Sequence, residues 1–290
     1  MTDGRGVNVG LADPLRPAVA GTAADVPFIA IPPPDGDRDA PVVISWHGFD
    51  PPRAEASLAG ALPMTGLHAW RVYLGLPMFG VRGPAGGWPE LRERGAGDPL
   101  LQLYGPIVTQ AAAELEGVLL GLHDQMGIGR GPLGLSGFSS GGAAALLATA
   151  GGRTPVRAVA VVGAVIRPTS LIADSERRTG NAYPWSGPSR ELARRLDFLE
   201  RADDFAVHPM RPPIMLVTGQ RDHSAAAGDA NELHDAIAAR YGDPGRAAYR
   251  AVPELGPALT PEPGVDPVPQ SPAAVLTDKL LTDWFTRHLY

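Results

Sequence analysis

Leu135-Ser136-Gly137-Phe138-Ser139-Ser140-Gly141-Gly142 is the stretch of sequence that decides the fold. It follows an apolar run typical of a buried strand (132–135) and precedes a strong helix former (143–148). Its glycines fit the pattern G-x-S-x-G, in which the chain turns so sharply between strand and helix that larger side chains would clash. Such a turn strains the backbone at Ser139 and presents its hydroxyl beside the N-terminal N–H groups of the helix. The stretch therefore predicts a nucleophilic serine, with a merely glycine-rich turn as the alternative.

The overall composition excludes several classes of protein. The 290 residues are 44% hydrophobic, enough for a sizeable core, and the net charge of −6 comes without any basic cluster. We therefore expect neither nucleic acid nor a membrane as partner. Because there is no cysteine, disulfides, thiolate nucleophiles and cysteine-bound metals are excluded. Since neither a signal pattern nor an apolar run of about 18 residues is present, we expect a cytoplasmic protein.

Strands and helices are predicted to alternate along a single domain over 1–290. Apolar runs predict strands over 26–31, 41–46, 70–76, 156–162, 213–219 and 247–252. Helical spacing predicts helices over 53–62, 100–126, 231–241 and 273–289. A glycine- and proline-rich loop is expected over 77–99, and a cap insertion over 167–211 with polar helices that include 190–202. This order predicts an α/β protein with a mainly parallel sheet and helices on both faces.

Three polar segments follow predicted strands directly. They are His47-Gly48-Phe49, Ser139 and Asp222. The carboxyl ends of parallel strands lie at one edge of the sheet, where active sites of such proteins are found. We therefore expect these three segments to gather at one site.

These motifs resemble those of the α/β-hydrolase superfamily over nearly the whole chain, from about residue 26 to 290. The chain looks most like the branch that contains dienelactone hydrolases and prolyl-oligopeptidase-like enzymes. Ser139 occupies the nucleophile position, and Thr218-Gly219-Gln220-Arg221-Asp222 is similar to the segment that delivers the catalytic acid. His47-Gly48-Phe49 is similar to the turn that helps to bind an oxyanion.

The resemblance implies a role for each of these residues. Ser139 attacks a carbonyl carbon, the backbone N–H groups of Phe49 and Ser140 hold the oxyanion, and Asp222 orients an imidazolium. The His47 ring either satisfies backbone groups of the turn, which is the interpretation we favour, or lines the substrate site. Asp222 has the alternative of a turn or capping residue.

The catalytic histidine is missing from the place where the resemblance expects it. Pro257 stands there in the segment Val252-Pro253-Glu254-Leu255-Gly256-Pro257-Ala258-Leu259, and 253–272 contains no histidine. Proline cannot accept a proton, so the triad is degenerate. His223 and His208 are the candidates for a recruited base, while the remaining histidines are interpreted as surface or packing residues.

Three functions remain open at this point. The first is an enzyme acting on a small-molecule ester, thioester or lactone through Ser139. The second is a non-hydrolytic cyclase, lyase or bond-forming biosynthetic enzyme, and the third is a small-molecule binding protein. We expect Phe79, Trp88, Tyr183 and Trp185 to supply aromatic walls. No cofactor is expected, and no metal either, because no paired histidine or carboxylate spacing recurs. The sequence assigns no oligomeric state.

Overall fold

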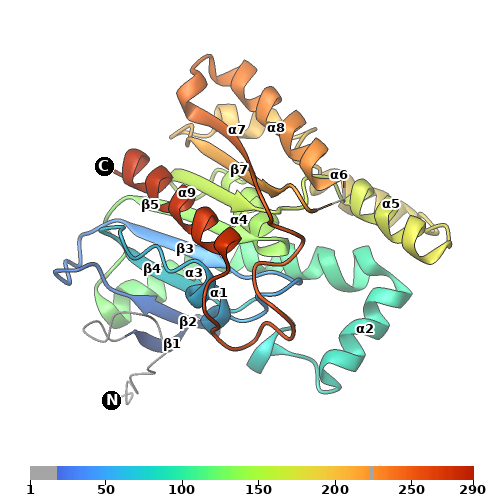
Figure 1. The fold of residues 1–290 in the computed structure, drawn as a ribbon, viewed down its shortest axis with the longest axis horizontal. Helices are drawn as coiled ribbons and strands as arrows, with labels where there is room; N and C mark the ends of the chain where they lie inside the picture. Colours follow the sequence, from blue (N-terminus) through green and yellow to red (C-terminus); the bar gives the residue numbers. More distant parts are fainter. Residues whose placement is uncertain (1–17, 223–224) are drawn as a thin grey trace.

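The computed structural model describes residues 18–222 and 225–290, which are built around an eight-stranded sheet (Figure 1). Six neighbouring strands, from β4 to β8 in the sheet, are parallel to one another. The first two strands form an antiparallel hairpin, and β2 also pairs antiparallel with β4. The strand order is β1-β2-β4-β3-β5-β6-β7-β8. The bounds are β1 Val19–Ala23, β2 Val26–Ile31, β3 Val42–Trp46, β4 Trp70–Leu74, β5 Leu133–Phe138, β6 Val156–Val162, β7 Ile214–Gly219 and β8 Ala247–Val252.

Helices cover both faces of this sheet, and each face has its own apolar core. One core includes side chains of α3 (Gly105–Met126), α4 (Ser140–Ala150) and α8 (Ala226–Tyr241). The other includes side chains of α1 (Glu55–Ala61) and α9 (Pro272–His288). The strands between them read as continuous apolar runs because both of their faces are buried, as in β3, where every residue is buried. The predicted doubly covered α/β sheet is confirmed.

Two segments differ from the prediction near the site. The segment 77–99 holds the short helix η1 (Gly80–Arg82) and α2 (Gly87–Gly97), where we expected a loop. Pro89 is tolerated there because the first turn of a helix needs no intrahelical N–H donor. Arg94 pairs with Glu90 one turn away at 2.6 Å, and Leu91 is buried. The following π-helical segment η2 (Pro99–Tyr104) leads into α3, so the long helix predicted over 100–126 is divided.

The insertion between β6 and β7 also folds differently from the prediction. It contains α5 (Pro168–Thr179), α6 (Gly187–Arg195) and α7 (Ala202–Val207), so the single helix predicted over 190–202 is wrong. A capping box between Ser186 and Ser189 starts α6 early. The Asp197 carboxylate accepts hydrogen bonds from the N–H groups of Leu199 and Glu200, which turns the chain between α6 and α7.

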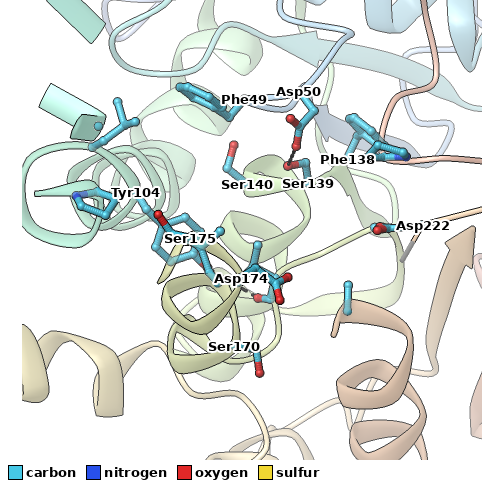
Figure 2. A pocket seen from close by; sticks show the side chains of 18 of the residues that line it. Phe49, Asp50, Tyr104, Phe138, Ser139, Ser140, Ser170, Asp174, Ser175 and Asp222 are labelled. Atoms are coloured by element: carbon cyan, nitrogen blue, oxygen red, sulfur yellow. Dashed lines mark hydrogen bonds between the residues drawn. The ribbon is translucent and has the colours of Figure 1, made fainter. Parts of the chain in front are cut away.

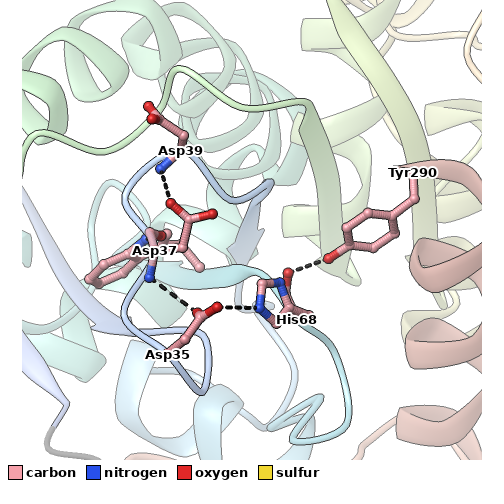
Figure 3. A network of polar contacts seen from close by, with 6 residues as sticks. Asp35, Asp37, Asp39, His68 and Tyr290 are labelled. Atoms are coloured by element: carbon pink, nitrogen blue, oxygen red, sulfur yellow. Dashed lines mark hydrogen bonds and ion pairs between the residues drawn. The ribbon is translucent and has the colours of Figure 1, made fainter.

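A small polar network joins the C-terminal residue to the loops that follow β2 and precede β4 (Figure 3). The Tyr290 hydroxyl donates to the carbonyl of His68, and the His68 ring pairs with the Asp35 carboxylate at 2.9 Å. The loop before β4 is thereby joined to the end of α9. Among residues 18–222 and 225–290, no helix has the length and apolarity needed to cross a membrane.

Candidate functional site

Ser139 lies on a strained turn between β5 and α4. Its backbone has φ 51° and ψ −121°, outside the regions that L-residues normally occupy. A Cβ on Gly137 would lie 2.3 Å from the backbone of Gly141, and one on Gly141 would lie 2.2 Å from the carbonyl oxygen of His47. Only glycine fits at these two positions, as the pattern predicted. The backbone N–H of Ser139 donates to the carbonyl of Val162, which fixes the turn to β6.

The turn faces a cavity of about 650 Å³ at the carboxyl edge of the sheet (Figure 2). Ser139 is 7% exposed and opens onto this cavity. Its walls come from α2, from η2 with the start of α3, and from α5, and they include Leu91, Leu103, Tyr104, Ile107, Ser170, Leu171 and Asp174. The walls from η2 and α3 are mainly apolar, whereas the wall from α5 also carries polar and charged side chains such as Ser170, Asp174 and Arg178. This composition suits a small organic molecule.

The hydroxyl of Ser139 donates a hydrogen bond to a carboxylate. The acceptor is Oδ2 of Asp50, at 3.1 Å (Figure 2). Burial raises the pKa of Asp50, against opposing effects of the Ser139 hydrogen bond and the Arg53 guanidinium; the charges of Asp222 and Glu262 raise it further. Ser139 therefore faces a carboxylate that is a stronger base than an exposed aspartate.

Asp50 is held in a firmly bonded turn after β3. The N–H of Gly48 donates to the carbonyl of Pro52 at 3.0 Å, which closes the turn around Asp50. Arg53 Nε donates to the carbonyl of Phe49 at 2.8 Å. The carbonyl of Pro51 accepts from the N–H of Leu259, in the loop after β8. Bonds on both sides of Asp50 thus fix its position relative to Ser139 before any substrate binds.

The two residues predicted to supply oxyanion donors lie at the same cavity. Phe49 and Ser140 line the cavity together with Ser139. The N–H of Ser140 opens α4, where the first N–H groups of a helix lack intrahelical partners and carry partial positive charge. Ser140 is 3% exposed, and its hydroxyl has no hydrogen-bond partner among the described residues.

Asp222 and Pro257 also line the cavity. Asp222 follows β7 by three residues, and its N–H donates to the carbonyl of Gly219 in a turn. In Figure 2 the Asp50 carboxylate points at Ser139, whereas Asp222 lies farther off. Pro257 occupies the wall of the cavity where the resemblance places an imidazole, so that part of the wall supplies no base.

The histidines considered above lie away from the cavity or outside the described residues. His47 is fully buried, its Nδ1 bonded to the Gly48 carbonyl and its Nε2 accepting from the N–H of Leu76. It therefore satisfies the backbone, and burial lowers its pKa to about 4. His208 is also buried and bonds the Thr154 carbonyl and the N–H of Met210. His223 lies outside the described residues, and none of the six other histidines lines the cavity.

The four aromatic residues expected as cavity walls are not among the residues that line the cavity. Phe79 packs edge-on against His47 and Phe49, with ring centroids 5.1 and 6.0 Å apart. Trp88 packs on Phe49 at 5.4 Å and under the Arg53 guanidinium at 4.5 Å. These two residues support Phe49, which itself lines the cavity.

The other pair fastens the insertion to the body of the protein. Tyr183 packs edge-on against Trp185, with ring centroids 4.9 Å apart, and its hydroxyl donates to Asp98 at 2.7 Å. Asp98 caps η2, so this bond joins the segment after α5 to the wall of the cavity.

The part of the chain described here contains no cluster of three or more histidine, aspartate or glutamate side chains placed to hold a metal ion.

Sequence reasoning missed Asp50. The resemblance implies a histidine as the proton acceptor, so the carboxylate of Asp50 was not predicted in that role. The signal was an acidic residue placed directly after the oxyanion turn, in Gly48-Phe49-Asp50-Pro51-Pro52, where prolines restrict the backbone. That the side chain reaches back to Ser139 depends on how the turn closes, which the local pattern does not reveal.

The strand order and the strained serine turn at the carboxyl edge define the α/β-hydrolase fold. The chain is similar to TT1662 from Thermus thermophilus, with a TM-score of 0.67 and 18% identity over 94% of this chain and 97% of that one. It is also similar to a dienelactone hydrolase from Anabaena variabilis, with a TM-score of 0.54 and 17% identity over 95% and 98% of the two chains. The Pyrococcus horikoshii acylaminoacyl peptidase gives a TM-score of 0.61 and 16% identity over 94% of this chain and 41% of that one.

These similarities confirm the predicted fold. No family model and no curated protein matches the sequence. Because the identities are below one fifth, the similarities carry no assignment of substrate.

Proposed function

We propose that this protein is an enzyme that acts on a small-molecule ester, thioester or lactone by forming an acyl bond to Ser139. The observation that carries the proposal is a serine on a strained strand-to-helix turn, opening onto a cavity of about 650 Å³ and already hydrogen-bonded to a proton acceptor. Backbone strain of this kind costs about 1–3 kcal/mol and is retained mainly where it positions a reacting group.

The neighbouring groups suit acyl transfer. In this proposal the backbone N–H groups of Phe49 and Ser140, two residues that line the cavity with Ser139, bind the oxygen of the tetrahedral intermediate. Each such donor is worth about 3–4 kcal/mol in the transition state. The apolar part of the cavity wall, which includes Leu103, Tyr104 and Ile107, suits the carbon skeleton of a small carbonyl compound. The segment 167–211, which we predicted as a cap, contributes α5 to these walls.

The experiment is covalent labelling of the purified protein with a fluorophosphonate, followed by peptide mass mapping and by assays with p-nitrophenyl acetate, an aryl thioester and a lactone. We expect the label on Ser139 and measurable turnover of at least one substrate, both abolished in Ser139→Ala. A protein that neither takes up the label nor turns over any of the three would contradict the proposal and favour a binding protein.

A second candidate is proton abstraction from carbon next to a carbonyl, as in a cyclase or lyase. The observation that favours it is the Asp50 carboxylate, since buried carboxylates with raised pKa are effective bases for carbon acids. The same amides would then stabilise an enolate. Incorporation of solvent deuterium into a β-keto ester, followed by NMR, distinguishes the two candidates. If the protein abstracts a proton from carbon, Ser139→Ala should still catalyse this exchange. If the protein is an acyl-transfer enzyme, Ser139→Ala should lose its hydrolytic activity.

A further inference from the structure

The two groups on which proton transfer depends are already in contact. Ser139 Oγ and Asp50 Oδ2 are 3.1 Å apart, within the reach required of a general base. Within the described residues this is the hydrogen bond that the Ser139 side chain makes, and it comes from a residue 89 positions away in sequence. The contact joins the two turns that follow the neighbouring strands β3 and β5.

We infer that Asp50 is the general base of the reaction at Ser139, in place of the histidine that Pro257 replaces. This inference rests on the proposed function and names the proton acceptor for it. The three observations behind it are the direct contact with Ser139, the bonded turn that fixes Asp50, and the placement of all six described histidines away from the cavity.

The reaction consists of acylation and deacylation of Ser139, and Asp50 carries the proton in both. In acylation Ser139 Oγ bonds to the carbonyl carbon while its proton passes to Asp50 Oδ2. The tetrahedral intermediate collapses as the bond to the leaving group breaks, and Asp50 returns the proton to the departing oxygen or sulfur. In deacylation Asp50 takes a proton from water, the resulting hydroxide adds to the acyl carbon, and the proton returns to Ser139 as the acid is released.

Charge is moved rather than created in the first step. Before attack the negative charge is on Asp50; after attack Asp50 is neutral and the charge is on the oxyanion beside the amides of Phe49 and Ser140. A carboxylate close to the oxyanion therefore does not oppose the intermediate, because it has been neutralised when the intermediate forms. Deprotonation of Ser139 without such an acceptor would place a second charge in the same cavity.

The groups around Asp50 strengthen it as a base. Burial is the main cause that raises the pKa of Asp50; the charges of Asp222 and Glu262 raise it further, whereas the Ser139 hydrogen bond and the Arg53 guanidinium lower it. Arg53 is engaged with the Phe49 carbonyl and with Glu262, and it lies against Trp88. Asp222 is therefore interpreted as a residue that tunes Asp50, a role that needs no imidazole between them.

The test compares Asp50→Asn with the wild-type protein in the rate of fluorophosphonate labelling and of p-nitrophenyl acetate hydrolysis. Asparagine keeps the size of the side chain and removes the base, so we expect both rates to fall by about 100-fold or more. Asp278→Asn is the matched control: Asp278 is also an aspartate with a pKa raised by burial, on α9 and outside the cavity, and its replacement leaves both rates unchanged.

A pH profile and chemical rescue separate a base from a merely structural residue. The acylation rate of the wild type should rise as Asp50 ionises, and Asp222→Asn should move that rise to lower pH. In Asp50→Ala, added formate should restore part of the rate, because a small carboxylate can occupy the space vacated; this measurement needs only a folded Asp50→Ala protein, checked by thermal melting.

The outcomes distinguish this inference from the proposed function. If the wild type labels at Ser139 and Asp50→Asn labels equally fast, Asp50 is not the base, while the proposed function stands. If Asp50→Ala is folded and inactive but formate leaves it so, with the pH profile of Asp222→Asn unshifted, the inference also fails. A wild-type protein that neither labels nor turns over substrate overturns both.

Discussion

Gly141→Ala is expected to destabilise the protein severely, although alanine is normally the better helix residue. Within α4 the replacement should gain up to about 1 kcal/mol from helix propensity. The added Cβ, however, would lie 2.2 Å from the His47 carbonyl oxygen and 2.4 Å from that of Trp46. Contacts of this kind are comfortable at about 3.5 Å, so a gap of more than about 1 Å has to open.

The size of the effect follows from what must move. Both atoms are backbone, at the end of β3 and in the turn that carries Phe49 and Asp50, so no side chain can rotate away. Overpacking that requires backbone shifts typically costs about 1–3 kcal/mol and occasionally more, and we place this case at the upper end, about 3 kcal/mol net. For a chain of this size that corresponds to a fall in Tm of roughly 5 °C.

Gly228→Ala provides the matched control. Gly228 is exposed in the first turn of α8, and a Cβ there meets no atom within 4 Å. This replacement should be neutral or stabilising by about 0.5 kcal/mol. Calorimetry and urea unfolding of the two variants measure the difference, and fluorophosphonate labelling should be lost only in Gly141→Ala. If Gly141→Ala were as stable as Gly228→Ala, the assigned close contact between α4 and the turn after β3 would be wrong.

Three further predictions concern two buried titratable groups and position 257, where proline replaces the expected histidine. His47 stays neutral in the folded protein down to about pH 4, so the unfolded chain binds more protons below pH 6.5. The free energy of unfolding should therefore fall by up to about 3 kcal/mol as the pH is lowered from 6.5 to 4. Urea unfolding of His47→Gln at several pH values should lack this dependence. Asp278 affects the pH dependence of stability in the opposite direction, because burial raises its pKa to about 6 and the folded state then binds more protons. The free energy of unfolding should fall as the pH rises from 3.8 to 6. Asp278→Asn should therefore be more stable than the wild type by up to about 3 kcal/mol at pH 7, but not at pH 3.5. Pro257→His should place an imidazole on the cavity wall and raise p-nitrophenyl acetate hydrolysis about 10-fold or more in an Asp50→Asn background; no gain would show that position 257 is out of reach of Ser139.

The sheet could be predicted because its signal is strong and local. Strands buried on both faces need apolar residues at successive positions, so runs such as Val42–Trp46 and Val156–Val162 stand out from the sequence. The serine turn could be predicted for a similar reason: steric contacts of 2.2–2.3 Å leave glycine as the residue that fits at 137 and 141. β1 was missed because Val19–Ala23 is partly exposed and carries only a short, small-residue pattern.

The side-chain arrangement of the site could not be predicted in the same way. Which aromatic residues line a cavity depends on how segments pack, and Phe79 and Trp88 lie one layer behind Phe49. His208 lies near the end of the predicted insertion, but its ring is hydrogen-bonded to the Thr154 carbonyl. The contact between Asp50 and Ser139 is a tertiary one, made by the closure of one turn against another.

Replacing imidazole by a carboxylate has a cost that the site reduces. The ordinary pKa of aspartate lies about 2.6 units below that of histidine, which makes proton transfer from serine less favourable by about 3.5 kcal/mol. Burial of Asp50 and the negative charges of Asp222 and Glu262 act in the direction that narrows this gap. Arg53 acts against them, but its guanidinium is shared with Glu262 and with the Phe49 carbonyl. In this arrangement the acid that would orient an imidazolium has a different role: the Asp222 charge adds to the effect of burial on the pKa of Asp50, so replacing Asp222 should affect the reaction through that pKa.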